Sequence, residues 1–104
     1  MDRIAFKMKL FPGCEAEYKK RHDELWPELS ALLKQTGISE YSIFLEEETG
    51  SLFGFLKARD QALLDSLPSH AIMQKWWAHM SDIMESNPDN SPVGISLKEV
   101  FYLP

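Results

Sequence analysis

The stretch EYSIFLEEETGSLFGFL, residues 40–56, decides the fold because it contains two strand-like runs joined by turn residues. The first run, residues 40–45, directs every second side chain to one face of a strand. The side chains on that face are Tyr41, Ile43 and Leu45. The second run, residues 52–56, is more continuously apolar, and Glu-Glu-Thr-Gly at residues 47–50 supplies the turn. The stretch therefore predicts a β-hairpin in the middle of the chain.

A helical region precedes the hairpin, and a strand precedes that region. Residues 15–35 repeat apolar side chains at helical spacing, and Gly37 is a suitable stop. Pro27 lies inside this region, so either the helix kinks at Trp26 or a second helix begins there with proline in its first turn. Residues 3–10 alternate between apolar and other side chains, which predicts the first strand almost at the N-terminus.

A second helical region and a last strand follow the hairpin. Residues 60–67 predict a short helix that Pro68 stops. Ser69 is placed to cap a further helix that runs to about Glu85. Residues 97–103 predict the final strand. The order of elements is therefore β-α-β-β-α-β, which indicates an α+β protein with the ferredoxin-like arrangement.

Size and packing add two expectations. The 104 residues suit a single domain, residues 1–104, because two separate cores would each be close to the lower size limit. In a sheet of this kind the helices cover one face. Adjacent strand residues point to opposite faces, so Leu52 and Leu56 make one face apolar while Phe53 and Phe55 make the other apolar. We therefore expect a homodimer in which sheet packs against sheet.

Charge and cysteine content exclude several classes of partner and site. Eleven Lys and Arg against 16 Asp and Glu give a net charge of -5, which argues against nucleic acid as a partner. Neither a leader sequence nor an apolar run of membrane-spanning length is apparent, so we expect no membrane association and a cytoplasmic protein. The single cysteine, Cys14, allows no internal disulfide and is expected to be a small buried hydrophobe.

Two hydrogen-bonding side chains point toward the core from the first helical region. Tyr18 and His22 lie four residues apart near the centre of its apolar stripe, so they stack on one face about 6 Å apart along the axis. The other members of the stripe are Leu25, Trp26, Leu29, Leu32 and Leu33. Periodicity leaves two interpretations open. One is a core histidine beside a packing tyrosine, and the other is a pocket in which His22 exchanges protons near neutral pH.

Two adjacent tryptophans mark the second helical region. Trp76 and Trp77 cannot point in the same direction on a helix, so at least one indole is expected at the boundary of the core. Both could fill core volume, or one could stack on the apolar face of a sugar. No metal site is expected, because His70 and His79 lie on opposite sides of a helix, and no cofactor-binding motif is present.

Taken together, the motifs resemble those of the L-rhamnose mutarotase family over nearly the whole chain. The matching pieces are Glu17-Tyr18, His22, Trp26-Pro27-Glu28-Leu29, Tyr41-Ser42-Ile43, Trp76-Trp77, the run NPDNSP at residues 87–92 and the ending EVFYLP. The resemblance implies a dimeric α/β barrel that interconverts the α and β anomers of L-rhamnose without a cofactor. It also implies His22 as the proton donor, with the sugar bound by Tyr18, Tyr41, Trp76 and Trp77.

The residues suit that chemistry, and two other classes stay open. Anomerisation is an acid-base reaction that needs neither hydride, metal nor nucleophile. One inward-facing histidine and a nearby tyrosine supply the groups that such a reaction requires. A cofactor-free or haem-using monooxygenase could place a flat ligand in the same pocket of this fold. A non-catalytic sugar-binding module would hold the sugar without accelerating anomer exchange.

Overall fold

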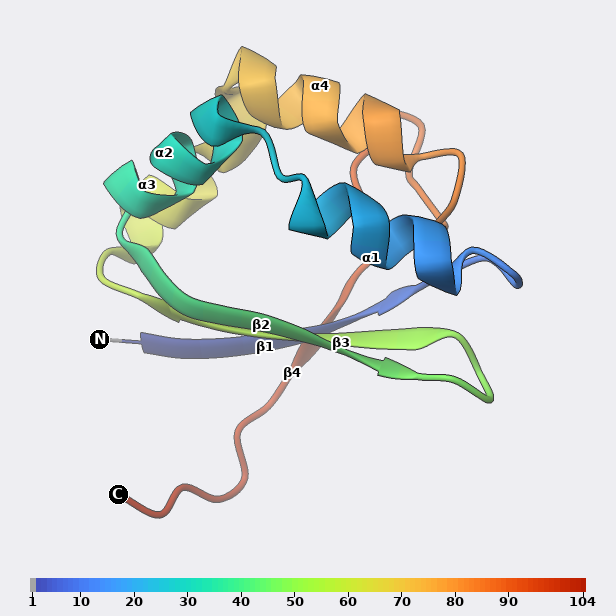
Figure 1. Cartoon of the computed structure of the whole chain (residues 1–104). Coiled ribbons are helices and arrows are strands. Elements are labelled where there is room, and N and C mark those ends of the chain that lie inside the picture. Colours follow the sequence, from blue (N-terminus) through green and yellow to red (C-terminus); the bar gives the residue numbers. More distant parts are fainter. Residues whose placement is uncertain (1) are drawn as a thin grey trace.

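A four-stranded antiparallel sheet with helices on one face makes up the computed structural model, which describes residues 2–104 (Figure 1). The strands are β1 (Asp2–Lys9), β2 (Ile38–Glu46), β3 (Ser51–Ala58) and β4 (Ile95–Leu97). The helices are α1 (Glu15–Asp23), α2 (Pro27–Gln35), α3 (Gln61–Asp65), the 3-10 turn η1 (Leu67–Ser69) and α4 (Ala71–Met80). The strand order β2-β3-β1-β4 confirms the predicted ferredoxin-like fold and its central hairpin. In residues 2–104 no helix is long and apolar enough to cross a membrane.

The predicted break in the first helical region is confirmed at Pro27. Helix α1 ends at Asp23, and α2 begins with the proline at its first position. Trp26 has an extended backbone with ψ 130°, as expected for a residue whose helical conformation the following proline ring disfavours. The break turns α2 away from α1, so the two helices cover different parts of the sheet (Figure 1).

The limits predicted for the last helix are wrong at both ends. Helix α4 begins after His70, whose extended backbone makes it the N-cap residue. Ser69 is not the cap, and its hydroxyl donates to the Ser66 carbonyl instead. The helix ends at Met80 rather than near Glu85, because the chain beyond it pairs with the end of β1 and the residues that follow. That pairing includes the bond from the Glu85 amide to the Lys9 carbonyl, which a helix could not make.

The predicted final strand, residues 97–103, is also wrong. Strand β4 covers Ile95–Leu97 and pairs with Ala5–Lys7 of β1, and residues 98–104 leave the sheet on the side opposite the helices (Figure 1). There Arg3 binds the Glu99 carboxylate through two nitrogens and stacks over the Tyr102 ring. Apolar alternation indicates strand propensity, but a strand also needs a partner for its backbone, and here side-chain contacts hold the segment instead.

The core lies between the sheet and the helices. Its buried members include Leu10, Leu29, Leu52 and Met80. At the centre of the sheet the Phe6 ring of β1 occupies the space above Gly54 of β3, where a Cβ atom would lie 2.4 Å from the ring. The glycine therefore lets Phe6 lie across the sheet beneath the helices, where it makes an edge contact with Tyr41.

The other face of the sheet carries apolar side chains as well, as the sequence predicted. Strand pairing sets Phe44, Phe53 and Ile95 in one row with Lys7. Phe44 is 68% exposed and Ile95 is 59% exposed. We call this surface the outer face. The exposed apolar side chains of residues 98–104 extend it, namely Val100, Phe101, Tyr102 and Leu103.

Candidate active site

A cavity of about 1290 Å³ lies between the helices and the inner face of the sheet. All five predicted site residues line it, although they come from three separate parts of the chain. They are Tyr18, His22, Tyr41, Trp76 and Trp77. Most of the remaining wall is apolar, so a ligand inside would meet a few polar groups against an apolar background.

Helix α1 supplies the two polar side chains that the sequence places on its inner face. The rings of Tyr18 and His22 stack with centroids 4.3 Å apart and planes 30° apart. His22 Nδ1 lies 3.0 Å from the carbonyl oxygen of Tyr18, one helical turn earlier. A carbonyl oxygen accepts hydrogen bonds only, so Nδ1 carries the proton and donates it there. The other ring nitrogen, Nε2, is therefore the one available for proton transfer.

Burial sets the ionisation of these groups. Loss of water contact lowers the pKa of His22 below its ordinary 6.5, although the hydrogen bond to the Tyr18 carbonyl opposes that shift. Burial also raises the pKa of Tyr18 well above its ordinary value. Although Tyr41 is 40% exposed, desolvation of its phenol group raises the pKa to about 12. Near pH 7 both phenols therefore keep their protons and can donate hydrogen bonds to a ligand.

Helix α4 brings its two tryptophans to the cavity in different ways. Trp76 is 6% exposed and meets the His22 ring edge-on, with centroids 5.4 Å apart. Trp77 lines the same cavity but is half-buried, at the boundary of the core. The expectation that adjacent indoles diverge, with one at the boundary, is thus confirmed.

The sheet contributes Tyr41 from the irregular part of β2. The pairing of β2 with β3 shifts register between Ser39 and Ser42, and Glu40 there adopts a positive φ of 49°. Bulges of this kind redirect nearby side chains. The Tyr41 ring lines the cavity and contacts the Phe6 ring edge-on at 6.2 Å.

Three aromatic contacts near the site were not predicted. Trp26, the residue at the helix break, packs edge-on against Trp76 with centroids 5.1 Å apart. His79 lies 5.4 Å from Trp26 and 5.6 Å from Trp76, measured between ring centroids. Trp26 belongs to the apolar stripe of the sequence, so its packing at the edge of the core could be foreseen. Its partner on α4 is fixed by tertiary packing. In residues 2–104 no cluster of three His, Cys, Asp or Glu side chains is arranged to hold a metal.

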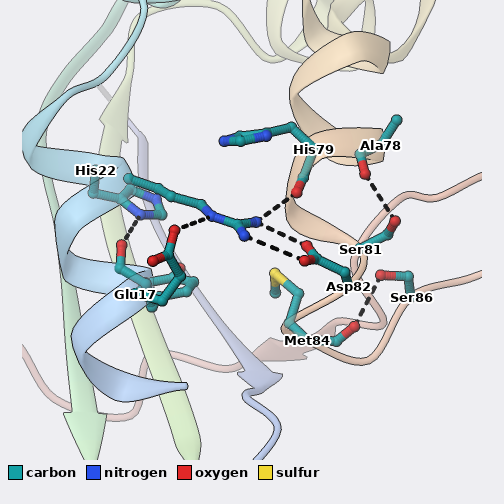
Figure 2. A network of polar contacts seen from close by, with 10 residues as sticks. Glu17, His22, Ala78, His79, Ser81, Asp82, Met84 and Ser86 are labelled. Atoms are coloured by element: carbon teal, nitrogen blue, oxygen red, sulfur yellow. Dashed lines mark hydrogen bonds and ion pairs between the residues drawn. The ribbon is translucent and has the colours of Figure 1, made fainter.

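A polar network beside the site was also missed. Arg21 of α1 forms ion pairs with Glu17 on its own helix and with Asp82 just beyond α4. Figure 2 shows these bonds, together with the one that reaches the backbone carbonyl of His79. The spacing of Glu17 and Arg21 is a sequence signal for a helical ion pair, but no local pattern could pair Arg21 with a residue 61 positions away.

Cys14, expected as a small buried hydrophobe, is half-buried at the start of α1. It packs against the edge of the core, and its Sγ lies 3.9 Å from the Pro12 carbonyl oxygen. The cysteine is not among the residues that line the cavity.

Comparison with known proteins identifies close relatives over the full chain. The family model described as L-rhamnose mutarotase matches residues 3–103. The chain is 59% identical to the L-rhamnose mutarotase of Jannaschia sp., with 100% of both chains covered. It is 60% identical to the L-rhamnose mutarotase of Agrobacterium fabrum, over 100% of this chain and 97% of the relative.

Solved structures agree with the sequence matches. The crystal structure of an L-rhamnose mutarotase from Formosa agariphila has a TM-score of 0.94 and 55% identity, with 100% of both chains covered. A Mycobacterium tuberculosis protein has a TM-score of 0.58 at 13% identity, over 98% of this chain and 97% of that one. An antibiotic biosynthesis monooxygenase scores 0.51 at 13% identity, over 94% and 97%. The last two likenesses concern the fold alone.

Proposed function

The chain belongs to the L-rhamnose mutarotase family, and from that premise we propose a mechanism in which His22 transfers the proton that opens and closes the sugar ring. The protein is an isomerase that interconverts the α and β anomers of L-rhamnose. The observation that carries the mechanism is the meeting of His22, two phenols and two indoles in one cavity.

Ring opening needs a proton on the ring oxygen while the anomeric hydroxyl loses one. His22 in its imidazolium form gives the proton from Nε2 to the ring oxygen, and a water molecule or a neighbouring hydroxyl receives the anomeric proton. The C1–O5 bond breaks and the aldehyde rotates. As the ring recloses on the other face, the sugar's O5 hydroxyl returns its proton to His22, and the anomeric oxygen regains a proton from the group that had received it. The lowered pKa of His22 makes its imidazolium a stronger acid, which suits a weakly basic ether oxygen.

The aromatic groups hold the sugar for this transfer. Trp76 and Trp77 offer apolar surfaces for the pyranose face and for the methyl group of a 6-deoxy sugar. Tyr18 from the helix side and Tyr41 from the sheet side offer hydroxyls that stay protonated near pH 7. Together they fix the ring oxygen near the imidazole, so the reaction gains from orientation as well as from acid catalysis.

The test of this function is the rate of anomer exchange, measured by NMR saturation transfer between the α and β signals of L-rhamnose. We expect the protein to accelerate exchange of L-rhamnose above the rate in buffer. Parallel measurements on L-mannose, L-fucose and D-glucose define the range of sugars accepted. A sugar that binds without faster exchange would instead indicate a non-catalytic sugar-binding module.

We also propose that the protein is a homodimer joined through the outer face of the sheet. Phe44 and Ile95 are 68% and 59% exposed there, beside the exposed apolar residues 100–103. Burying such a surface against a second copy removes apolar area from water at about 25 cal/mol per Å². The row is self-complementary in character, since it combines phenylalanine with an aliphatic side chain and can pack against its own copy, as a two-fold interface requires.

Phe44→Glu is expected to shift the protein from dimer to monomer, because it places a charge on the outer face while replacing a side chain the monomer leaves exposed. Light scattering after size exclusion measures the mass against twice the 12.0 kDa of the chain. Leu63→Glu, a similar change on α3 in the helix layer, is the control and stays dimeric. A monomeric wild type, or a Phe44→Glu dimer as stable as wild type, contradicts the interface.

A further inference from the structure

We propose that Arg21 is a positioning residue for the mutarotase reaction. It holds α1 in place against α4, so that His22 stays aligned with Trp76 and Trp77, the tryptophan platform of α4. The inference rests on the proposed role of His22. Arg21 neighbours His22 in sequence, so a helical step of about 100° directs its side chain away from that of His22. Arg21 is absent from the residues that line the cavity, so it acts on the site through the position of the helix and not by touching the sugar.

The guanidinium makes four hydrogen bonds to three partners. Its Nε donates to Glu17 Oε2 at 2.7 Å, within α1. Its two terminal nitrogens donate to the two carboxylate oxygens of Asp82, at 2.8 and 3.2 Å. One of them also donates to the backbone carbonyl of His79 at 2.6 Å. Arg21 therefore binds both the last turn of α4 and the segment after it (Figure 2).

Burial and geometry distinguish this contact from an ordinary surface ion pair. The Arg21 side chain is 13% exposed, whereas the pair of Lys19 and Asp23 on the same helix is 76% and 61% exposed. A two-point contact between a planar guanidinium and a carboxylate fixes orientation as well as distance. The contact to the His79 carbonyl adds a backbone point on α4, so rotation or sliding of α1 would break bonds at several atoms.

Catalysis depends on the relative position of α1 and α4, which the contact of Arg21 with Asp82 fixes. The rings of His22 on α1 and Trp76 on α4 lie 5.4 Å apart, although the two residues are far apart along the chain. If Trp76 and Trp77 hold the sugar, movement of α1 carries the imidazole away from the ring oxygen. Displacing a reacting group by about 1 Å can cost on the order of 10²-fold in rate. Loss of the contact should therefore lower kcat more than it raises KM.

The experiment uses variants at Asp82, which is 66% exposed and lies outside the regular helix, so that the core is left intact. Asp82→Ala removes the two-point contact, and Asp82→Glu restores a carboxylate. Arg21→Lys keeps the charge but loses the planar fork. Glu17→Gln is the matched control, because Glu17 contacts the same guanidinium without reaching α4. Anomer exchange of L-rhamnose gives kcat and KM, and near-ultraviolet circular dichroism verifies folding.

We expect Asp82→Ala and Arg21→Lys to lower kcat by about 10- to 100-fold with KM changed less than about threefold. Asp82→Glu should recover most of that loss, and Glu17→Gln should stay near wild type. Unchanged kcat in folded Asp82→Ala and Arg21→Lys overturns the inference, as does a loss confined to KM or shared equally by Glu17→Gln. A wild type that fails to accelerate exchange instead overturns the proposed function and this inference with it.

Discussion

His22→Ala is expected to slow enzyme-catalysed anomer exchange of L-rhamnose by about 10²- to 10⁴-fold, the usual contribution of a positioned acid or base. The variant removes the group that protonates the ring oxygen but leaves the indoles and phenols that bind the sugar. KM should therefore change much less than kcat. Saturation transfer between the two anomeric signals, at sugar concentrations above and below KM, measures both constants.

The pH dependence provides an independent check on the same role. Burial lowers the pKa of His22 below its ordinary 6.5, and the imidazolium form is populated only when the pH falls below this lowered pKa value. The enzymatic part of kcat/KM should rise as pH falls through that value, after the buffer-catalysed rate is subtracted. His70→Ala is the control, because His70 stands at the start of α4 and does not line the cavity. A folded His22→Ala with wild-type exchange discards the assignment.

Trp76→Ala is expected to lower both stability and sugar binding. The indole is 6% exposed and contacts the rings of Trp26 and His22, so its loss leaves a cavity in the core. Truncation of a buried tryptophan to alanine typically costs about 3–5 kcal/mol of unfolding free energy. The same change removes part of the sugar platform, so KM should rise as well. Urea unfolding followed by circular dichroism, together with exchange kinetics, measures the two effects.

Trp77→Ala separates binding from packing. Trp77 lines the same cavity but is half-buried, so its removal should raise KM with a smaller loss of unfolding free energy than Trp76→Ala. Trp76→Phe keeps an aromatic ring and should recover part of the stability. Equal stability losses at the two positions, or an unchanged KM in both alanine variants, would contradict a sugar platform formed by Trp76 and Trp77.

Local sequence patterns predicted the parts of the fold that depend on neighbouring residues. The hairpin at residues 40–56 follows from its alternation and turn, and the break before Pro27 follows from the missing amide and the ring of proline. Helical spacing also placed Tyr18 and His22 on one inward face, where the structure finds both on the cavity wall.

Patterns failed where a residue depends on a partner far along the chain. The alternation of residues 97–103 resembles a strand, yet the ladder ends at Leu97 and side-chain contacts to Arg3 hold the rest. Helix α4 ends early because the chain beyond it pairs with residues next to β1. The contact of Arg21 with Asp82 spans 61 positions, so no local pattern predicts it and only the tertiary packing of the two helical regions creates it.

The most direct test of the mechanism is the response of the His22 nitrogens to the sugar, observed by NMR of protein labelled with nitrogen-15 at histidine. We expect saturating L-rhamnose to shift the Nε2 resonance of His22, while the resonance of His70, away from the cavity, stays in place. A His22 resonance that does not move while the protein rapidly exchanges the two anomers would contradict the mechanism.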